Sequence, residues 1–258
     1  MHAPLPSLAA SLVERRVLGT FVSLRDPAVV SLCAAAGFET VVVDGEHGAM
    51  NPETVGHLVT AAHASRIPAI VRVGVSFRYV VQQALESGAD AVMAPMVESA
   101  EQAEAFASFC RYPPQGTRGF HALTGGSAFG AVPASNVVTF SNDRMITLVQ
   151  VETARGLDQC EAIARAKGVD VLFFGPGDMS LSLGVPPGSQ AIRDAAARVA
   201  RAALGAGKLF GTFVTTEAEA REAVALGARL VIASSDTQWF LQSTRAACGT
   251  FLSTLGDS

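Results

Sequence analysis

Short apolar runs alternate with longer helical patterns along the chain. The runs are rich in β-branched residues and bounded by turn residues, as buried strands are. We predict eight strands, at Val17–Val22, Thr40–Asp44, Ala69–Val73, Ala91–Met96, Ile146–Glu152, Val171–Gly175, Leu209–Val214 and Leu230–Ala233. Ala-rich helical patterns lie between them, among them Glu101–Cys110, Gly156–Ala166, Ser189–Leu204 and Glu217–Leu226. Strands that alternate with helices form parallel βαβ units, so eight units in 258 residues favour a (β/α)8 barrel over an open sheet.

The segment Arg111–Phe140 interrupts this alternation. It holds Pro113-Pro114, several glycines and Pro133, so we predict one long loop between the fourth and fifth strands. Loops of this length in a compact barrel are typical of lids or binding segments. Aromatic side chains such as Phe120 and Phe129 give the loop material to pack, which argues against a disordered insertion.

Composition fits one barrel domain that spans residues 1–258. The chain is 49% hydrophobic, and its net charge of −4, without a basic face, argues against nucleic acid and anionic membranes as partners. No apolar run is long enough to cross a bilayer. The first sixteen residues predict a leading helix rather than a signal peptide, and four scattered cysteines indicate a reduced, cytoplasmic protein.

Polar residues gather where several predicted strands end. Asp44-Gly45-Glu46-His47 follows the second strand directly. Arg72, Glu152 and Asp178 stand at the ends of the third, fifth and sixth strands. In a (β/α)8 barrel the active site lies at the carboxyl ends of the strands, so these side chains are expected to face one bowl.

Each of these residues also has a purely structural explanation. Arg72 could form a salt bridge at the rim, and His47 could lie on the surface. Glu152 could be a negative charge that the dipole of the following helix stabilises, and Asp178 could cap a short helix. Four ionisable groups at the ends of four strands nevertheless indicate a common site better than they indicate four separate coincidences.

Glu152 and Asp178 offer two hard oxygen ligands from neighbouring strands. Together with water and substrate oxygens they suit an octahedral divalent ion, Mg²⁺, Mn²⁺ or Co²⁺. The two lysines, Lys167 and Lys208, precede strands and therefore belong to the opposite end of the barrel. A Schiff-base mechanism is thereby excluded. Phosphate-loop and dinucleotide-binding motifs are missing from the sequence, so we expect no organic cofactor.

In this order, the residues resemble the HpcH/HpaI aldolase family, the metal-dependent (class II) pyruvate aldolases. The matching segments are Val43–Gly48, Val71–Val73, Ala94–Val97, Arg111–Gly119, Val149–Thr153 and Phe174–Ser180. The resemblance implies a (β/α)8 barrel that assembles as a hexamer, a dimer of trimers, with the last helix exchanged between neighbours.

The resemblance also implies a role for each residue of the site. Glu152 and Asp178 would bind the metal, and Arg72 would hold the ketone oxygen of a pyruvate-like substrate. The substrate carboxylate would meet the backbone amides of Gly177 and Asp178. His47 would be the acid/base residue.

Three further carboxylates complete the predicted site. Family members pair the catalytic histidine with a carboxylate that corresponds here to Glu86, where we expect aspartate in the better-known members. Glu46 is expected to bond to water around the metal. Asp44 is expected to support the end of its strand.

The first hypothesis is a lyase that cleaves a 4-hydroxy-2-oxoacid to pyruvate, or a close 2-oxoacid, and an aldehyde through a metal-stabilised enolate. A lyase like citrate lyase β or malyl-CoA lyase is the runner-up, although only Arg111, Arg118 and Arg144 offer cations for the CoA phosphates. A barrel that binds 2-oxoacids without catalysis is the third alternative. The sequence leaves the identity of the aldehyde open, and His121 of the long loop is one candidate to contact it.

Overall fold

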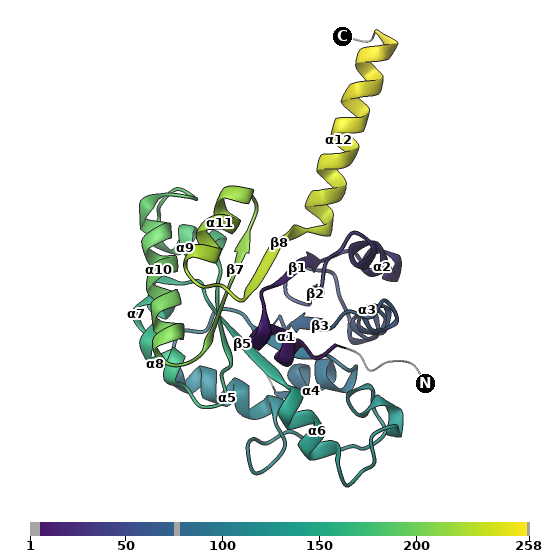
Figure 1. Ribbon diagram of the computed structural model, residues 1–258, viewed down its shortest axis with the longest axis vertical. Helices are drawn as coiled ribbons and strands as arrows, with labels where there is room; N and C mark the ends of the chain where they lie inside the picture. Colours follow the sequence, from purple (N-terminus) through teal and green to yellow (C-terminus); the bar gives the residue numbers. More distant parts are fainter. Residues whose placement is uncertain (1–5, 75–77, 257–258) are drawn as a thin grey trace.

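Eight parallel strands close into a barrel in the computed structural model, which describes residues 6–74 and 78–256 (Figure 1). The strands are β1 (Val17–Val22), β2 (Thr40–Asp44), β3 (Ala69–Arg72), β4 (Ala91–Ala94), β5 (Ile146–Val151), β6 (Val171–Phe174), β7 (Leu209–Val214) and β8 (Leu230–Ser235). They follow one another around the barrel in chain order, and β8 pairs with β1. The predicted single-domain (β/α)8 barrel is confirmed, and each predicted strand overlaps an observed one.

Helices connect the strands on the outside of the barrel, and two more stand at the ends of the chain, α1 before β1 and α12 after β8. They are α1 (Leu8–Glu14), α2 (Pro27–Ala35), α3 (Pro52–Ala64), α4 (Arg78–Glu86), α5 (Ala100–Cys110), η1 (Gly125–Gly130), α6 (Val137–Arg144), α7 (Ala154–Asp158), α8 (Cys160–Arg165), α9 (Pro176–Leu183), α10 (Gln190–Gly205), α11 (Glu217–Ala225) and α12 (Asp236–Leu255). The part of the predicted leading helix at residues 1–5 lies outside the described residues. Within the described part of the chain, no helix is long and apolar enough to cross a membrane.

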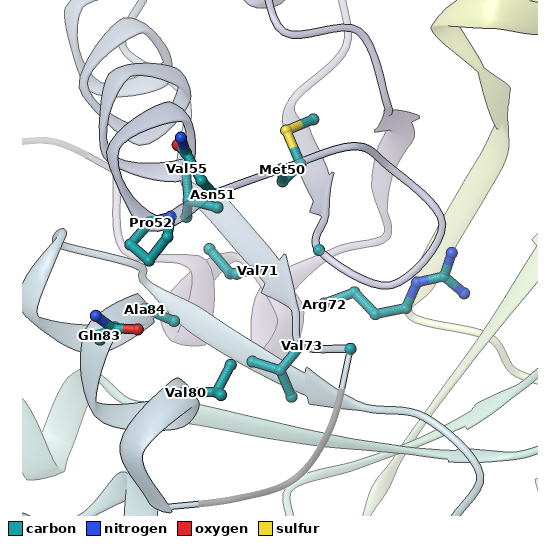
Figure 2. A pocket seen from close by; sticks show the side chains of 12 residues that line it. Met50, Asn51, Pro52, Val55, Val71, Arg72, Val73, Val80, Gln83 and Ala84 are labelled. Atoms are coloured by element: carbon teal, nitrogen blue, oxygen red, sulfur yellow. The ribbon is translucent and has the colours of Figure 1, made fainter.

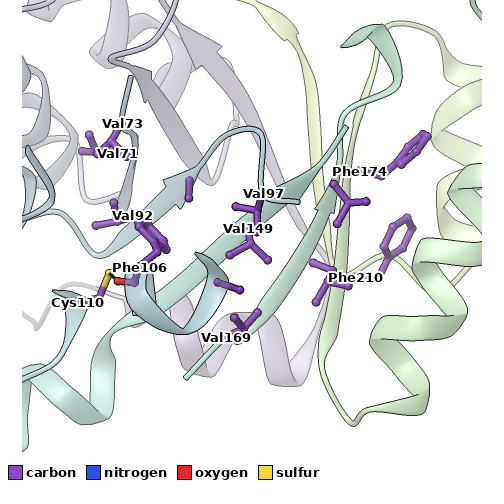
Figure 3. Close-up of a cluster of buried hydrophobic side chains, with 14 of the residues drawn as sticks. Val71, Val73, Val92, Val97, Phe106, Cys110, Val149, Val169, Phe174 and Phe210 are labelled. Atoms are coloured by element: carbon purple, nitrogen blue, oxygen red, sulfur yellow. Dashed lines mark hydrogen bonds between the residues drawn. The ribbon is translucent and has the colours of Figure 1, made fainter. Parts of the chain in front are cut away.

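The period-two alternation of each strand divides the core into two layers. One layer fills the barrel interior, where Val42, Ile70, Leu148 and Phe173 meet and the helix α1 adds Leu12. The other layer lies between the outside of the barrel and the helices. Figure 3 shows part of it, labelling Val71, Val73, Val92, Val97, Phe106, Cys110, Val149, Val169, Phe174 and Phe210.

The helix α12 departs from this plan. It leaves the barrel after β8 and extends away from it, so the last turns touch nothing else in the view of Figure 1. Only its first residue, Asp236, is buried. Asp236 accepts hydrogen bonds from the amides of Ser23 (3.0 Å) and Leu24 (2.9 Å), which ties the start of α12 to the loop after β1.

Candidate active site

A cavity of about 240 Å³ opens at the carboxyl end of the barrel. Its walls come from seven of the eight strands and the loops that follow them. They consist of Phe21, Ser23, Asp44, His47, Arg72, Gln150, Glu152, Phe173, Gly175, Pro176, Gly177, Asp178, Phe213 and Ser235. Five residues predicted from the sequence therefore line one cavity, namely Asp44, His47, Arg72, Glu152 and Asp178.

Strand alternation explains why these side chains point inward. Val42 lies in the interior core, so Asp44, two residues later on β2, has the same orientation. Ile70 and Arg72 repeat the relation on β3. At the carboxyl end of the barrel, the side chains that point inward thus change from aliphatic to ionisable, while the alternation along each strand continues unchanged.

Arg72 is held by two carboxylates and an aromatic ring. The register of β2 and β3 sets Asp44 beside Arg72, and the guanidinium donates two hydrogen bonds to that carboxylate, Nε to Oδ1 at 3.0 Å and Nη2 to Oδ2 at 2.7 Å. Its Nη1 lies 3.1 Å from Glu46 Oε2, and its Cζ lies 4.5 Å from the centre of the Phe21 ring. Bidentate pairing of this kind fixes the orientation of an arginine.

Asp44 also shapes the turn that carries His47. Burial alone would raise the pKa of Asp44, but the hydrogen bonds and charge of Arg72 lower it overall. The ionised Oδ1 accepts hydrogen bonds from the amides of Glu46 and His47, each at 3.1 Å. The His47 side chain is 63% exposed, and its Nε2 lies 3.8 Å from Glu46 Oε2. The imidazole is therefore accessible at the mouth of the cavity.

Glu152 is a buried carboxylate with a fixed orientation. Its Oε1 accepts a hydrogen bond from the amide of Met96 and its Oε2 one from Gln150 Nε2, both at 2.8 Å. Burial raises its pKa to about 7; the Met96 hydrogen bond opposes the rise, and the negative charges of Asp178 and Glu46 add to it. The carboxylate thus lies in a negative environment that favours a cation beside it.

The backbone around Glu152 is arranged to admit this side chain. Met96 has φ of +53°, an uncommon value for a residue with a Cβ, and this conformation accompanies the hydrogen bond from its amide to Glu152. On the other side, a Cβ at Gly175 would stand 2.4 Å from Glu152 Oε2, too close for any side chain. Glycine is required here because the carboxylate packs directly on the backbone.

The helix α9 begins at the cavity. Gly175 is its N-cap and Pro176 its first residue, so Gly177 and Asp178 lie in the first turn, where amides have no partner within the helix. Open space surrounds the position of a Cβ at Gly177. Free amides at a helix N-terminus attract anions, and the Asp178 carboxylate lines the same wall.

Arg72 separates this cavity from a second, smaller hollow of about 90 Å³. Apolar side chains such as Val55, Val71, Val73 and Val80 line most of the smaller one. In Figure 2 the guanidinium of Arg72 extends away from them. The reactive end of Arg72 therefore belongs to the larger cavity, and the smaller hollow holds its aliphatic base.

Several residues of the cavity wall were not predicted from the sequence. Gln150 orients Glu152, and its own Oε1 is buried without a hydrogen-bond partner. Phe21 and Phe213 also face the cavity, with ring centres 5.8 Å apart. The signal was available: Gln150 stands two residues before Glu152 and shares its orientation.

Glu86, the carboxylate expected beside the catalytic histidine, does not pair with His47 within one chain. The helix α4 runs back from the carboxyl end of β3, so its last residue, Glu86, lies at the amino end of the barrel, and His47 lies at the carboxyl end. The Glu86 carboxylate instead faces Arg118, with Nη2 to Oε1 at 3.3 Å. The carboxylate that faces the His47 imidazole is that of Glu46, with Nε2 to Oε2 at 3.8 Å.

The long loop predicted at Arg111–Phe140, expected as a lid or a binding segment, does not line this cavity within one chain. The segment Arg111–Phe140 connects α5 to β5, and a helix-to-strand connection lies at the amino end of a barrel. It is not one loop either, because it contains η1 and the start of α6. His121 lies in this segment, away from the cavity, and its Nδ1 accepts a hydrogen bond from the amide of Leu123 at 3.2 Å.

The two carboxylates predicted to bind a metal fit a hard divalent ion. Among the residues that the structure describes, no cluster of three or more His, Cys, Asp or Glu side chains is placed to hold a metal. Glu152 and Asp178 would therefore supply two ligands, as magnesium sites do when substrate and water provide the others. Asp178 and Glu46 also place two further negative charges near the Glu152 carboxylate, an arrangement that a bound cation would offset.

Comparison with known proteins points to one family. The family model described as HpcH/HpaI aldolase/citrate lyase matches residues 17–243. A hydroxypyruvate/pyruvate aldolase of Deinococcus radiodurans is 36% identical over 92% of this chain and 86% of its own length. A 4-hydroxy-2-oxovalerate aldolase of Rhodococcus jostii is 33% identical over 97% and 98%. The crystal structure of an HpcH/HpaI aldolase/citrate lyase family protein from Burkholderia cenocepacia, 32% identical, superimposes with a TM-score of 0.88 and covers 95% and 98% of the two chains.

Proposed function

This chain belongs to the HpcH/HpaI aldolase/citrate lyase family and is a carbon–carbon lyase, and from this premise we propose that it reversibly cleaves a 4-hydroxy-2-oxoacid to pyruvate, or a close 2-oxoacid, and an aldehyde. The observation that carries the proposal is the convergence of Arg72, Glu152, Asp178 and His47 on one cavity. Each supplies a function that enolate chemistry needs: a fixed cation, two metal ligands and a proton carrier.

Glu152 and Asp178 would hold a divalent ion, Mg²⁺, Mn²⁺ or Co²⁺. A bound ion of this kind supplies Lewis acidity to a 2-oxoacid. The chain's own contribution is orientation, because Met96 and Gln150 each donate a hydrogen bond to one oxygen of Glu152.

Arg72 would stabilise negative charge on the ketone oxygen. Its guanidinium keeps one direction because Asp44 and Glu46 hold three of its nitrogens. A donor that is oriented before the reaction stabilises developing charge without reorganisation. The free amides of Gly177 and Asp178 would receive the substrate carboxylate at the N-terminus of α9.

His47 would carry the proton. Histidine changes its charge near neutral pH and is the commonest acid/base residue. The turn built on Asp44 fixes the backbone of His47, while the imidazole stays open at the cavity mouth. It can therefore take a proton from the pyruvate methyl group, or return one, and exchange it with solvent.

The structure favours a free 2-oxoacid over a CoA thioester as substrate. The three arginines considered for the CoA phosphates lie at the amino end of the barrel. Arg111 donates to the Gly168 carbonyl (2.7 Å), Arg118 faces Glu86, and Arg144 ends α6, two residues before β5 begins. They are thus far from the mouth where a thioester would bind, and assays with and without CoA should give the same turnover.

The proposed function predicts that the protein exchanges methyl protons of pyruvate in D2O without any aldehyde. In the presence of Mg²⁺ or Mn²⁺, NMR should show deuterium entering the methyl group, and His47→Ala should slow this exchange by about 100-fold or more. His57→Ala, at an exposed histidine of α3, is the matched control and should exchange at the native rate. A protein that binds pyruvate in calorimetry, yet exchanges no protons and cleaves no 4-hydroxy-2-oxoacid, would be a binding barrel rather than an aldolase.

We also propose that the protein works as a homo-oligomer through α12. This helix carries a series of exposed apolar side chains, namely Trp239, Phe240, Leu241, Phe251, Leu252 and Leu255. An isolated helix with such a surface gains no tertiary packing and is marginal in water. We propose that a second copy of the chain covers this face of α12. Two things support this choice: α12 projects away from its own barrel in Figure 1, and most soluble oligomers are symmetric assemblies of one chain.

The assembly proposal is tested by charging the exposed face of α12. Phe240→Asp together with Phe251→Asp should convert the oligomer to a smaller species in light scattering after size exclusion. Arg221→Gln on α11 removes an exposed charge from another helix and should leave the mass unchanged. A monomeric native protein, or an unchanged mass in the double variant, would contradict the proposal.

A further inference from the structure

Asp236, the first residue of α12, holds the loop that follows β1. Its Oδ1 accepts a hydrogen bond from the amide of Ser23 at 3.0 Å, and its Oδ2 accepts one from the amide of Leu24 at 2.9 Å. Oδ2 also lies 3.1 Å from the amide nitrogen of Ser23. Asp236 is buried, with 6% of the residue exposed. Two successive amides of one loop thus bind the two oxygens of a single carboxylate, and hydrogen bonds to a carboxylate are among the strong ones.

The end of β8 is irregular where it leads to this carboxylate. The register of β8 against β1 shifts between two pairs, Gly19 with Ile232 and Phe21 with Ser235. Between these pairs β8 has one residue more than β1, which makes a β-bulge. Ser234 lies in the bulge, is buried and has φ of +52°. A bulge changes the direction of the side chains beside it, and strain of this kind persists only where the surrounding structure imposes it.

A second contact holds the first turns of α12 on β1. Trp239 Nε1 donates a hydrogen bond to Thr20 Oγ1 at 3.2 Å. The Thr20 hydroxyl in turn donates to the carbonyl of Ser234 at 3.3 Å, and both of these residues are buried. The start of α12 is therefore fixed against β1, although the rest of the helix extends away from the barrel (Figure 1).

The loop held by Asp236 contacts the active-site carboxylate through Ser23. Ser23 lines the cavity, and its hydroxyl donates to Asp44 Oδ2 at 3.4 Å. The same oxygen accepts from Arg72 Nη2, and the other oxygen of Asp44 accepts from the amide of His47. Asp236 thus stands at the far end of a series of hydrogen bonds that orients both the guanidinium and the turn of the histidine.

From this geometry we propose that Asp236 is a positioning residue of the active site. It holds the loop after β1 so that Ser23 supports Asp44, which keeps Arg72 in one orientation. Asp236 is not among the residues that line the cavity, so it acts without touching the substrate. A donor that is fixed before the reaction stabilises developing charge without reorganisation. This inference rests on the proposed function, because it gives Asp236 a part in that reaction.

The test replaces Asp236 by asparagine. The side chain keeps its size, but its new NH2 group faces a backbone amide that needs an acceptor. Hydrogen exchange at the amides of Ser23 and Leu24, measured by mass spectrometry, should be faster than in the native protein. In cleavage of a 4-hydroxy-2-oxoacid with Mn²⁺, kcat should fall by about 10- to 100-fold. KM should stay within about threefold of the native value, because the lost orientation acts in the transition state.

Asp26→Asn is the matched control. Asp26 lies at the other end of the same loop, where its Oδ1 accepts from the amide of Ala28 at 2.9 Å and caps α2. Asparagine caps helices as well as aspartate does, so this variant loses the same charge and should keep the native kcat. An equal loss of kcat in both variants would reveal a general effect of charge near the loop and would overturn the inference.

Ser23→Ala tests whether Asp236 acts through the Ser23 hydroxyl. This variant keeps the two loop amides and loses only the contact with Asp44, so kcat should fall several-fold. Added to Asp236→Asn, it should lower kcat little further, because residues that share one contact are not additive. Fully additive losses, or a native kcat in Asp236→Asn, would overturn the inference. If Asp236→Asn does not fold, a native kcat in Ser23→Ala overturns it in the same way.

Exchange of pyruvate methyl protons separates this inference from the proposed function. If the native protein and Asp236→Asn both exchange protons and cleave substrate at equal rates, the proposed function stands and the positioning role is refuted. If the native protein neither exchanges nor cleaves, the proposed function fails, and the positioning role fails with it even where the loop amides are protected.

Discussion

Replacing Arg72 by lysine or alanine is expected to lower kcat by about 100- to 1,000-fold, the cost of removing one preorganised donor from a developing oxyanion. Lysine keeps the positive charge but lacks the planar fork that binds both oxygens of Asp44. The ketone would lose its oriented partner in either variant. Two assays measure the loss of rate: steady-state cleavage of a 4-hydroxy-2-oxoacid for the carbon–carbon bond, and methyl-proton exchange of pyruvate for the proton transfer.

The same substitutions are expected to affect stability through Asp44. Arg72→Ala leaves a buried carboxylate without its partner, which costs about 3–5 kcal/mol in comparable buried pairs. Because the folded-state pKa of Asp44 is lowered, the stability from the pair is present above the unfolded-state pKa and is lost as pH falls through the folded-state value. The difference between native and variant in the free energy of unfolding should therefore shrink on acidification, as followed by urea titration.

Arg111→Lys is the matched control for Arg72. Arg111 is also a buried arginine bound to a carboxylate, with Nη2 2.6 Å from Asp170 Oδ2, but it lies at the amino end of the barrel. The Arg111→Lys protein should be less stable than the native protein, while its kcat in the folded state stays near the native value. A folded Arg72→Ala protein with native turnover would show that this guanidinium has no part in the chemistry.

Strand positions were accessible from the sequence because the barrel is built from short β-branched runs. Val42 and Asp44, or Ile70 and Arg72, show how the same period that identifies the strand also fixes the orientation of its last polar residue. Arg72 ends β3 and Glu152 directly follows β5, while His47 and Asp178 lie three and four residues after β2 and β6. All four line the cavity. Side chains whose position depends only on strand parity are predictable from one sequence.

Residues on helices and on helix-to-strand connections were predicted less well. Glu86 and the segment Arg111–Phe140 were assigned to the site, although the ends of helices return to the opposite end of the barrel. Lys167 and Lys208 were placed at that end because they precede strands, and Glu86 and the segment Arg111–Phe140 precede strands in the same way. The break between α7 and α8 at Gln159 and the unusual φ of Met96 depend on tertiary contacts, so no local pattern announces them.

Glu152→Gln is expected to lower kcat and the affinity for Mn²⁺ by at least about 100-fold, because even the partners of metal ligands cost 10- to 100-fold when they are lost. Glutamine keeps the size and one oxygen of the side chain, but it lacks the charge that a divalent ion needs. Chelation of the native protein should abolish turnover, and Mg²⁺, Mn²⁺ or Co²⁺ should restore it. Titration with Mn²⁺, monitored by electron paramagnetic resonance or calorimetry, measures the affinity for the ion independently of turnover.

Thermal unfolding distinguishes a lost ligand from a damaged fold. An ion that binds only the folded protein stabilises it by mass action, so Mn²⁺ should raise the Tm of the native protein and leave that of Glu152→Gln unchanged. Glu98→Gln is the matched control, since this carboxylate bonds to Thr153 Oγ1 at 3.0 Å and does not line the cavity; it should retain both the rise in Tm and the turnover. If the chelated protein keeps full turnover, Glu152 and Asp178 have another role, and Arg72 alone must stabilise the enolate.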